Sequence, residues 1–253
     1  MLTVNGKSFH WDARRDVVIP GDTEQTLTFC VDHLLMAYKQ AIQSHGNFCI
    51  ALSGGSTPKN IFHKLTHSPI KEQIDWSKIH LFWSDERSVG PDHVDSNYRM
   101  AMEEGFAKMP IPKDQIHRMQ AEEDAERYAI LYEDIMERIL KNRPFDYIML
   151  GMGDDGHTAS LFPHTSALSE EKKSVCANWI PQKDTWRMTL TYPCINQAAH
   201  IVIYVLGEGK KKTLLSVLKD EKPSIDYPIV KIGTTSNKAL WICDLAAGSS
   251  LKK

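Results

Sequence analysis

The chain brings two carboxylates and an imidazole together in one short loop, GMGDDGHTASLFP, which runs from Gly151 to Pro163. Glycine-rich sequence of this kind lets the backbone turn tightly and approach a ligand closely. A histidine beside an aspartate is a natural general base, and Asp155 precedes His157 by two residues. The spacing leaves open whether Asp154 or Asp155 is the partner, and a glycine-rich connector with an incidental histidine is the alternative. The density of ionisable groups favours acid–base chemistry centred on His157.

A second loop, SGGSTP, has the composition of an anion-binding turn. It lies between an apolar run and a predicted helix, and its glycines leave backbone N–H groups free at the helix N-terminus. We expect Ser56 or Thr57 to cap this helix and Pro58 to lie in its first turn. The loop has neither the Lys-Ser/Thr ending of a Walker motif nor the pattern G-x-G-x-x-G, and a tight capped turn without a ligand is the alternative. The residues predicted to hold phosphate are Gly54, Gly55, Ser56 and Thr57.

Three cationic side chains have positions that suit a phosphate site. Arg87 closes the run Asp85-Glu86-Arg87 after an apolar segment, Arg187 lies near another predicted strand, and Lys210 lies in the turn GEGK. Arginine binds phosphate through two parallel hydrogen bonds, and lysine binds it as a point charge. Taken singly, each of these three side chains is typical of an exposed surface residue. Together with the SGGSTP loop, Arg187 and Lys210 would complete a phosphate pocket, and Arg87 is predicted to fold over the ligand as a lid.

The elements that must position these residues alternate between strand-like and helix-like patterns. Alternation at this spacing is typical of βαβ units, so we expect one α/β domain over residues 1–253, with a mostly parallel sheet and helices on both faces. The predicted helices cover residues 23–44, 57–67, 97–107, 121–141 and 210–218, and the predicted strands cover 47–52, 79–83, 145–150, 175–180, 188–191, 200–206 and 239–243. From residue 248 onward we expect a frayed end.

Three of the motifs follow directly on predicted strands that end at Leu52, Trp83 and Leu150. In an open α/β sheet, ligands bind just beyond the carboxyl ends of the strands. The sequence therefore predicts that the three polar clusters meet at one edge of one sheet.

Composition narrows the class of protein. A formal net charge of −2, with Lys210–Lys212 as the one short basic cluster, gives no signal for nucleic acid. Five scattered cysteines without a C-x-x-C pattern are typical of reduced, buried thiols, and neither a signal peptide nor an apolar run of about 18 residues is present, so we expect a cytoplasmic protein that does not enter a membrane. His63 and His67 lie one helical turn apart without an evident third ligand, so we expect no metal. Nothing in the sequence calls for an oligomer, and we expect a monomer.

Taken in order along the chain, the motifs resemble those of the 6-phosphogluconolactonase family. The matching pieces are SGGSTP at residues 53–58, WSDER at 83–87 with SNY at 96–98, the run from Gly151 to Pro163, RMT at 187–189 and GEGK at 207–210. The resemblance implies a modified Rossmann-type, three-layer α/β/α sandwich. It also implies hydrolysis of 6-phosphogluconolactone to 6-phosphogluconate in the oxidative pentose phosphate pathway, without a cofactor.

Two other functions remain open at this point. The family resembles glucosamine-6-phosphate deaminases and isomerases in fold, but those enzymes usually have Asp-Glu-Tyr at the position of Asp85-Glu86-Arg87 and Asn-Glu-Pro at the end of the histidine loop. A sensor that binds a sugar phosphate without turnover is the second alternative. The resemblance and the residues together predict catalytic roles for His157, as the base that activates water, and for Asp155, which orients it.

Overall fold

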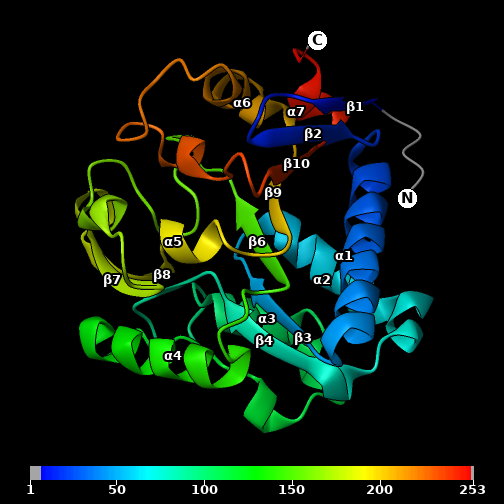
Figure 1. Cartoon of the computed structure of the whole chain (residues 1–253), viewed down its shortest axis with the longest axis vertical. Coiled ribbons are helices and arrows are strands. Elements are labelled where there is room, and N and C mark those ends of the chain that lie inside the picture. The colour runs from blue at the N-terminus through cyan, green and yellow to red at the C-terminus, as the bar shows by residue number, and fades with distance from the viewer. Residues whose placement is uncertain (1–6, 252–253) are drawn as a thin grey trace.

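The computed structural model describes residues 7–251, and within them the chain builds one large and one small β-sheet (Figure 1). The large sheet has seven strands in the order β1-β2-β10-β9-β6-β3-β4. Its β1–β2 pair is antiparallel and its other pairs are parallel, which confirms the mostly parallel sheet. The strands are β1 (Lys7–His10), β2 (Arg15–Ile19), β3 (Phe48–Leu52), β4 (Ile79–Trp83), β6 (Tyr147–Gly151), β9 (Ile201–Val205) and β10 (Ala239–Cys243).

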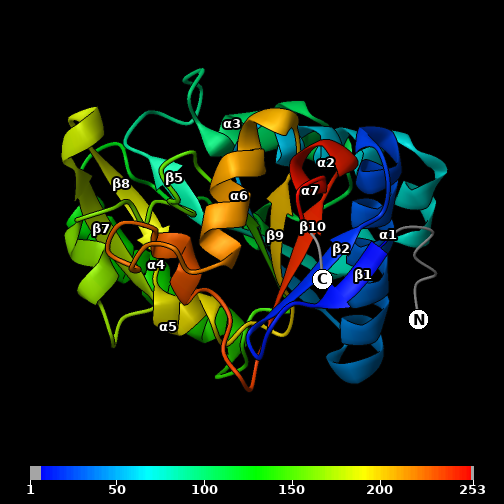
Figure 2. The ribbon, with the colours of Figure 1, turned by 90° about the horizontal axis from the view of Figure 1, so that it is seen from above.

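Helices flank the large sheet on its two sides, as the α/β/α prediction requires. Helix α1 packs on α2 and contacts β3 and β10, and Figure 2 shows α1 on the opposite side of the large sheet from α4 and α5. The helices are α1 (Thr23–His45), α2 (Ser56–His67), α3 (Asn97–Glu103), α4 (Ala125–Leu140), α5 (Tyr192–Ile195), α6 (Lys211–Leu218) and α7 (Leu245–Gly248).

The small sheet is antiparallel and has the strand order β5-β8-β7, with β5 at Asp85–Arg87, β7 at Val175–Ile180 and β8 at Thr185–Leu190. Helix α4 packs against β7 and β8. The predicted strands at 175–180 and 188–191 correspond to β7 and β8, but a separate sheet was not predicted, and β5 was missed because the charged run at 85–87 lacks the alternating apolar pattern of a strand. The strand conformation of β5 depends on its pairing with β8, which is far away in the sequence.

Local sequence explains the longest helix. At its start, the Asp22 carboxylate accepts a hydrogen bond from the backbone N–H of Gln25, and the Gln25 side chain accepts one from the backbone N–H of Asp22, which makes a capping box. Its end is Gly46, whose φ of 84° lies in the left-handed region that glycine adopts without strain. The apolar face between these ends buries Leu27, Val31 and Leu34 against the sheet.

Several predicted boundaries need correction. The helix expected at 121–141 begins at Ala125, because Asp124 caps it, and the helix expected at 97–107 ends at Glu103 before Gly105 breaks the chain direction. The helix expected from residue 210 begins at Lys211, after a 3-10 turn.

The chain ends also differ from prediction. Strands β1 and β2 were not predicted, and the expected fraying from residue 248 is wrong for Gly248, which closes α7, and for Leu251, which is buried. Residues 252 and 253 lie outside the described part of the chain.

Candidate active site

A polar cavity of about 240 Å³ opens at the carboxyl edge of the large sheet. The strands β6, β3 and β4 are neighbours in that sheet, so the loops that follow them converge there, as predicted. The small sheet supplies a further wall through β5 and β8. The lining residues are Ser53, Gly54, Gly55, Asp85, Arg87, Gly151, Met152, Gly153, His157, Ala159, Arg187 and Lys210.

His157 and Asp155 form a close pair at this cavity. The His157 Nδ1 atom lies 2.5 Å from Asp155 Oδ1, which also accepts a hydrogen bond of 3.1 Å from the His157 backbone N–H. Partial burial acts to raise the pKa of Asp155, but the hydrogen bond and charge of the imidazole hold it below its ordinary value. Within residues 7–251, Nε2 of His157 has no hydrogen-bond partner, so it is the nitrogen available for chemistry.

The neighbouring carboxylate has a different partner. Asp154 Oδ1 accepts a hydrogen bond of 2.7 Å from Lys210 Nζ, and its backbone carbonyl accepts one from Thr213 Oγ1. The alternative that the sequence left open is thus resolved in geometry: Asp155 contacts the imidazole, and Asp154 fixes Lys210 beside the loop.

Gly153 makes the Asp155–His157 pair possible. A Cβ atom at this position would lie 2.0 Å from His157 Nδ1 and 2.6 Å from Asp155 Oδ1. The loop then closes on itself, because the Gly153 backbone N–H donates to the His157 carbonyl and the Gly156 N–H donates to the Gly153 carbonyl. The glycine pattern seen in the sequence therefore serves the close approach of the two catalytic candidates.

Arg87 and Arg187 lie directly opposite each other in the β5–β8 ladder. Like charges in directly opposite positions destabilise a sheet. A bound anion would offset the repulsion between these two arginines. Among the described residues, the buried Nε atoms of both arginines lack a hydrogen-bond partner. Burial lowers the pKa of Arg187 from its ordinary value, while the nearby charge of Asp85 opposes this effect. Arg87 belongs to a strand and donates to the Asp95 carbonyl, so it forms part of the cavity wall.

The SGGSTP loop differs in one respect from prediction. Gly55, with φ of 103°, is the residue that caps α2, and no side chain of residues 7–251 caps this helix, so the expected capping by Ser56 or Thr57 is wrong. Both are the first helical residues, and their backbone N–H groups belong to the turn that helices leave without internal partners. Gly54 and Gly55 line the cavity, whereas Ser56 and Thr57 lie at its margin and do not line it.

Asp85 lines the cavity and belongs to the charged run that the sequence placed at this edge, although it was not among the predicted site residues. It is buried, accepts a hydrogen bond of 2.6 Å from Ser160 Oγ at Oδ2, and accepts one of 3.2 Å from Asn97 Nδ2 at Oδ1. The adjacent Glu86 faces the other way and accepts backbone N–H groups of Arg87, Asn97 and Tyr98. The position of the run Asp85–Arg87 after a buried strand indicated this edge, but it did not distinguish the Asp85 carboxylate from its charged neighbours.

Asn196, nine residues beyond Arg187 in the sequence, lies away from the cavity. Its side chain donates to the Lys231 carbonyl and accepts from the Gly233 N–H, so it supports a loop away from the cavity. His63 stacks on His67 with ring centroids 4.2 Å apart. No group of three or more metal-binding side chains occurs within residues 7–251, and no helix among them is long and apolar enough to cross a membrane.

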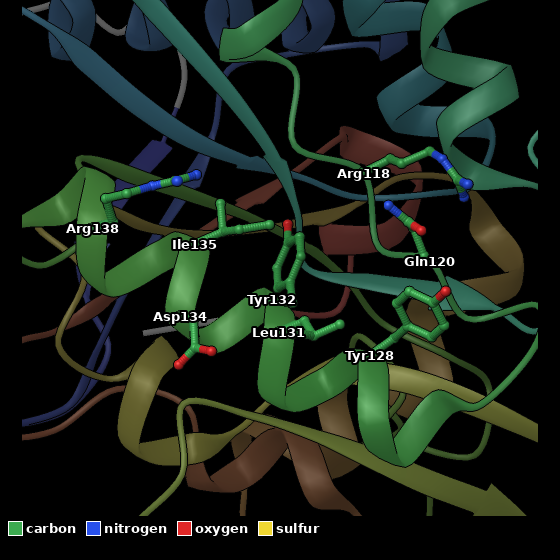
Figure 3. Close-up of a pocket in the computed structure, with 8 residues that line it drawn as sticks. All are labelled: Arg118, Gln120, Tyr128, Leu131, Tyr132, Asp134, Ile135 and Arg138. Carbon is green, nitrogen blue, oxygen red and sulfur yellow. The ribbon is translucent and has the colours of Figure 1, made fainter.

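A second hollow, of about 410 Å³, lies beside α4 (Figure 3). Tyr128, Tyr132 and Ile135 of α4 form one side, and Arg118 and Gln120 come from the segment before the helix. The Arg118 guanidinium is paired with Glu122, and none of the predicted site residues lies here. The cavity at His157, which gathers the predicted site residues, is therefore the candidate active site.

The fold is of the α/β class, with an acid–base pair and three cations gathered at the carboxyl edge of its sheet. Residues 21–241 match the family described as glucosamine-6-phosphate isomerases/6-phosphogluconolactonase. A 6-phosphogluconolactonase of Chlamydia pneumoniae is 44% identical over 204 residues, which make up 80% of this chain and 78% of that protein. One from Nostoc sp. is 36% identical over 245 residues, or 94% and 99% of the two chains.

The solved structure of a 6-phosphogluconolactonase from Trypanosoma cruzi has the same fold, with a TM-score of 0.83 at 24% identity, and the likeness covers 98% of this chain and 100% of that one. The chain belongs to the glucosamine-6-phosphate isomerase/6-phosphogluconolactonase family.

Proposed function

We propose that this protein hydrolyses 6-phosphogluconolactone to 6-phosphogluconate, with His157 as the general base. The single observation that carries the proposal is the Asp155–His157 pair beside Arg87, Arg187 and Lys210 in one cavity. The lactonase names of relatives at 36–44% identity support the same substrate.

The chemistry needs little beyond this pair, because a δ-lactone is an activated acyl group. Nε2 of His157 takes a proton from water, and the oxygen of that water bonds to the lactone carbonyl carbon. Asp155 holds the imidazole through Nδ1 and stabilises the imidazolium that forms. When the bond between the carbonyl carbon and the ring oxygen breaks, the imidazolium returns its proton to that oxygen.

The cations and free amides have two tasks, to hold the phosphate and to stabilise the negative oxygen of the tetrahedral intermediate. The backbone N–H groups at the start of α2, behind Gly54 and Gly55, suit the phosphate, with Arg187 and Lys210 as countercharges. A loop amide or an arginine would then meet the developing oxyanion. Holding the sugar at its phosphate end fixes the carbonyl carbon relative to His157.

A coupled assay tests the proposal directly. Glucose-6-phosphate dehydrogenase generates the lactone in place, and its disappearance is followed with and without this protein. We expect loss of lactone well above the spontaneous rate. Loss at the spontaneous rate would refute lactonase activity.

The same preparation is then given glucosamine 6-phosphate, the substrate of the other branch of the family. Release of ammonia would assign the protein to that branch instead. Ligand binding without turnover of either compound would identify a non-catalytic sensor.

A further inference from the structure

One face of the His157 imidazole is covered by an aromatic ring. The Phe162 ring lies parallel to it, with centroids 4.0 Å apart and an interplanar angle of 13°. Phe162 is only 3% exposed, yet it lies outside the continuous cluster of buried apolar side chains that forms the main core. Its one aromatic neighbour among the described residues is the His157 imidazole.

The backbone between the two rings is shaped to bring them together. Thr158 and Leu161 form an isolated antiparallel bridge, with the Leu161 N–H donating to the Thr158 carbonyl at 2.9 Å. Ala159, inside this reversal, has φ of 47°, a left-handed conformation that is costly for a residue with a Cβ atom. The reversal returns the chain toward His157, so that residue 162 reaches the imidazole five positions later.

Ser160 fixes this reversal to the small sheet through all its polar groups. Its Oγ donates to Asp85 Oδ2 at 2.6 Å, its N–H donates to Thr189 Oγ1 at 3.1 Å, and its carbonyl accepts from Asn178 Nδ2 at 2.9 Å. Because Ser160 is fully buried, these bonds hold the turn in one arrangement. The position of Phe162 is therefore set by anchored backbone on both sides of Ala159.

We infer that Phe162 is a positioning residue for His157, which holds the imidazole plane and stabilises its protonated form. Asp155 fixes one edge of the imidazole and Phe162 covers one face, so Nε2 faces the cavity in a single orientation. An aromatic face attracts a cation, so the ring favours the imidazolium that exists between proton uptake and proton return. The effect on turnover rests on the proposed function, whereas the effect on the imidazole does not.

The test is Phe162→Leu, which keeps an apolar side chain but removes the aromatic face. We expect kcat to fall by about 3- to 10-fold with KM within about twofold, because Asp155 still holds the imidazole and the misplacement stays below the roughly 1 Å that would cost about 10²-fold. The acid limb of the kcat/KM profile should move by about half a pH unit to lower pH, because the protonated ring loses its aromatic partner. Phe162→Tyr, which keeps the ring, should restore both values.

A matched control is Phe106→Leu, which removes an equally buried aromatic ring from the core between Phe62 and Trp76. This variant should lower Tm and leave the pH profile unchanged. An unchanged profile in Phe162→Leu, or the same profile shift in Phe106→Leu, would overturn the inference.

NMR of the His157 ring gives a readout that does not depend on lactone turnover. In the wild type, its carbon-bound protons should show the upfield shift caused by a stacked ring, and Phe162→Leu should lose this shift. If the wild type lacks activity but shows these shifts, the proposed function fails and the positioning role stands. If the lactone is hydrolysed but the shifts are absent, the positioning role fails. Should Phe162→Leu not fold, Phe162→Met carries the same comparison.

Discussion

At the scale of single residues, the candidate site depends on which side-chain atoms contact each other. Asp155 and Asp154 are adjacent and chemically identical, but one contacts the imidazole and the other contacts Lys210. The geometry thus divides two carboxylates between orientation of the base and placement of a cation. The two roles make different kinetic predictions.

Replacing His157 with alanine removes the proposed base. We expect kcat to fall by about 10²–10⁴-fold with a small change in KM, because general-base catalysis acts on the transition state. Asp155→Asn should lower kcat as well, whereas the adjacent Asp154→Asn should mainly raise KM through Lys210. Steady-state kinetics of the three purified variants measures this. Turnover of His157→Ala near that of the wild type would rule out its role as base.

Gly153 carries a second prediction at this scale. In Gly153→Ala, the new Cβ atom forces the His157 side chain away from Asp155, because it would otherwise lie 2.0 Å from Nδ1. Since the imidazole is the end of a side chain and can swing away, we expect a small change in Tm but a fall in kcat of about 10–10²-fold. Gly90→Ala is the matched control, because its Cβ would meet nothing within 4 Å. Equal kcat in the two variants would contradict the prediction.

At the scale of elements, the cavity exists because β5 joins β8 and so places two arginines opposite each other. Like charges directly opposite each other in a ladder are destabilising. An anion between them removes the repulsion. We therefore expect a bound anion to stabilise the small sheet.

Arg187→Gln tests this balance. We expect KM to rise by about tenfold or more, while Tm without ligand stays the same or rises slightly. Inorganic phosphate should raise Tm of the wild type and fail to do so in the variant. Lys183→Gln, an equal loss of charge at the exposed β7–β8 turn, is the control and should behave like the wild type. If KM is unchanged and kcat falls, Arg187 acts at the lactone carbonyl rather than at the phosphate.

Sequence patterns predicted most strands of both sheets, including β7 with its exact bounds and β8 in part, and they missed β1, β2 and β5. Strands such as β3 and β9 are fully buried apolar runs, so composition alone marks them. β5 consists of Asp85, Glu86 and Arg87, and its strand geometry depends on pairing with a segment about 100 residues away. The stacking of Phe162 on His157 was hidden for the same reason, because it depends on a reversal at Ala159 that its sequence does not signal.

At the scale of the whole molecule, three loops converge at one sheet edge because the strands that precede them are neighbours in the sheet. A mostly parallel sheet could be predicted from the sequence, but the order of its strands could not. The sequence indicated a parallel sheet, but the pairing of β6, β3 and β4 as neighbours is a tertiary property. One domain over residues 1–253 stays a prediction. What the structure adds is a set of buried ionisable groups whose effects reach beyond the site.

Two of these groups are buried histidines that should make the fold sensitive to acid. Burial, with a smaller effect from His200, lowers the pKa of His33 to about 4, and burial likewise lowers that of His117 to about 4, with His80 adding to it. His33 lies in the core, where its Nδ1 contacts the Tyr147 hydroxyl at 3.1 Å. In the unfolded chain both imidazoles take up protons near pH 6.5.

Between about pH 6.5 and pH 4 the unfolded chain therefore binds more protons than the folded protein. The stability that these neutral histidines contribute is complete above pH 6.5 and is lost as the pH falls toward 4, with a slope of about 1.4 kcal/mol per pH unit for each group. Urea unfolding at a series of pH values measures this slope. His33→Leu should reduce this slope by the contribution of one histidine, about 1.4 kcal/mol per pH unit, whatever its effect on the free energy of unfolding at about pH 7.5. His63→Gln, on the exposed face of α2, should leave the slope unchanged. A slope in His33→Leu equal to that of the wild type would show that His33 is protonated in the fold, and the Tyr147 contact would then need a different explanation.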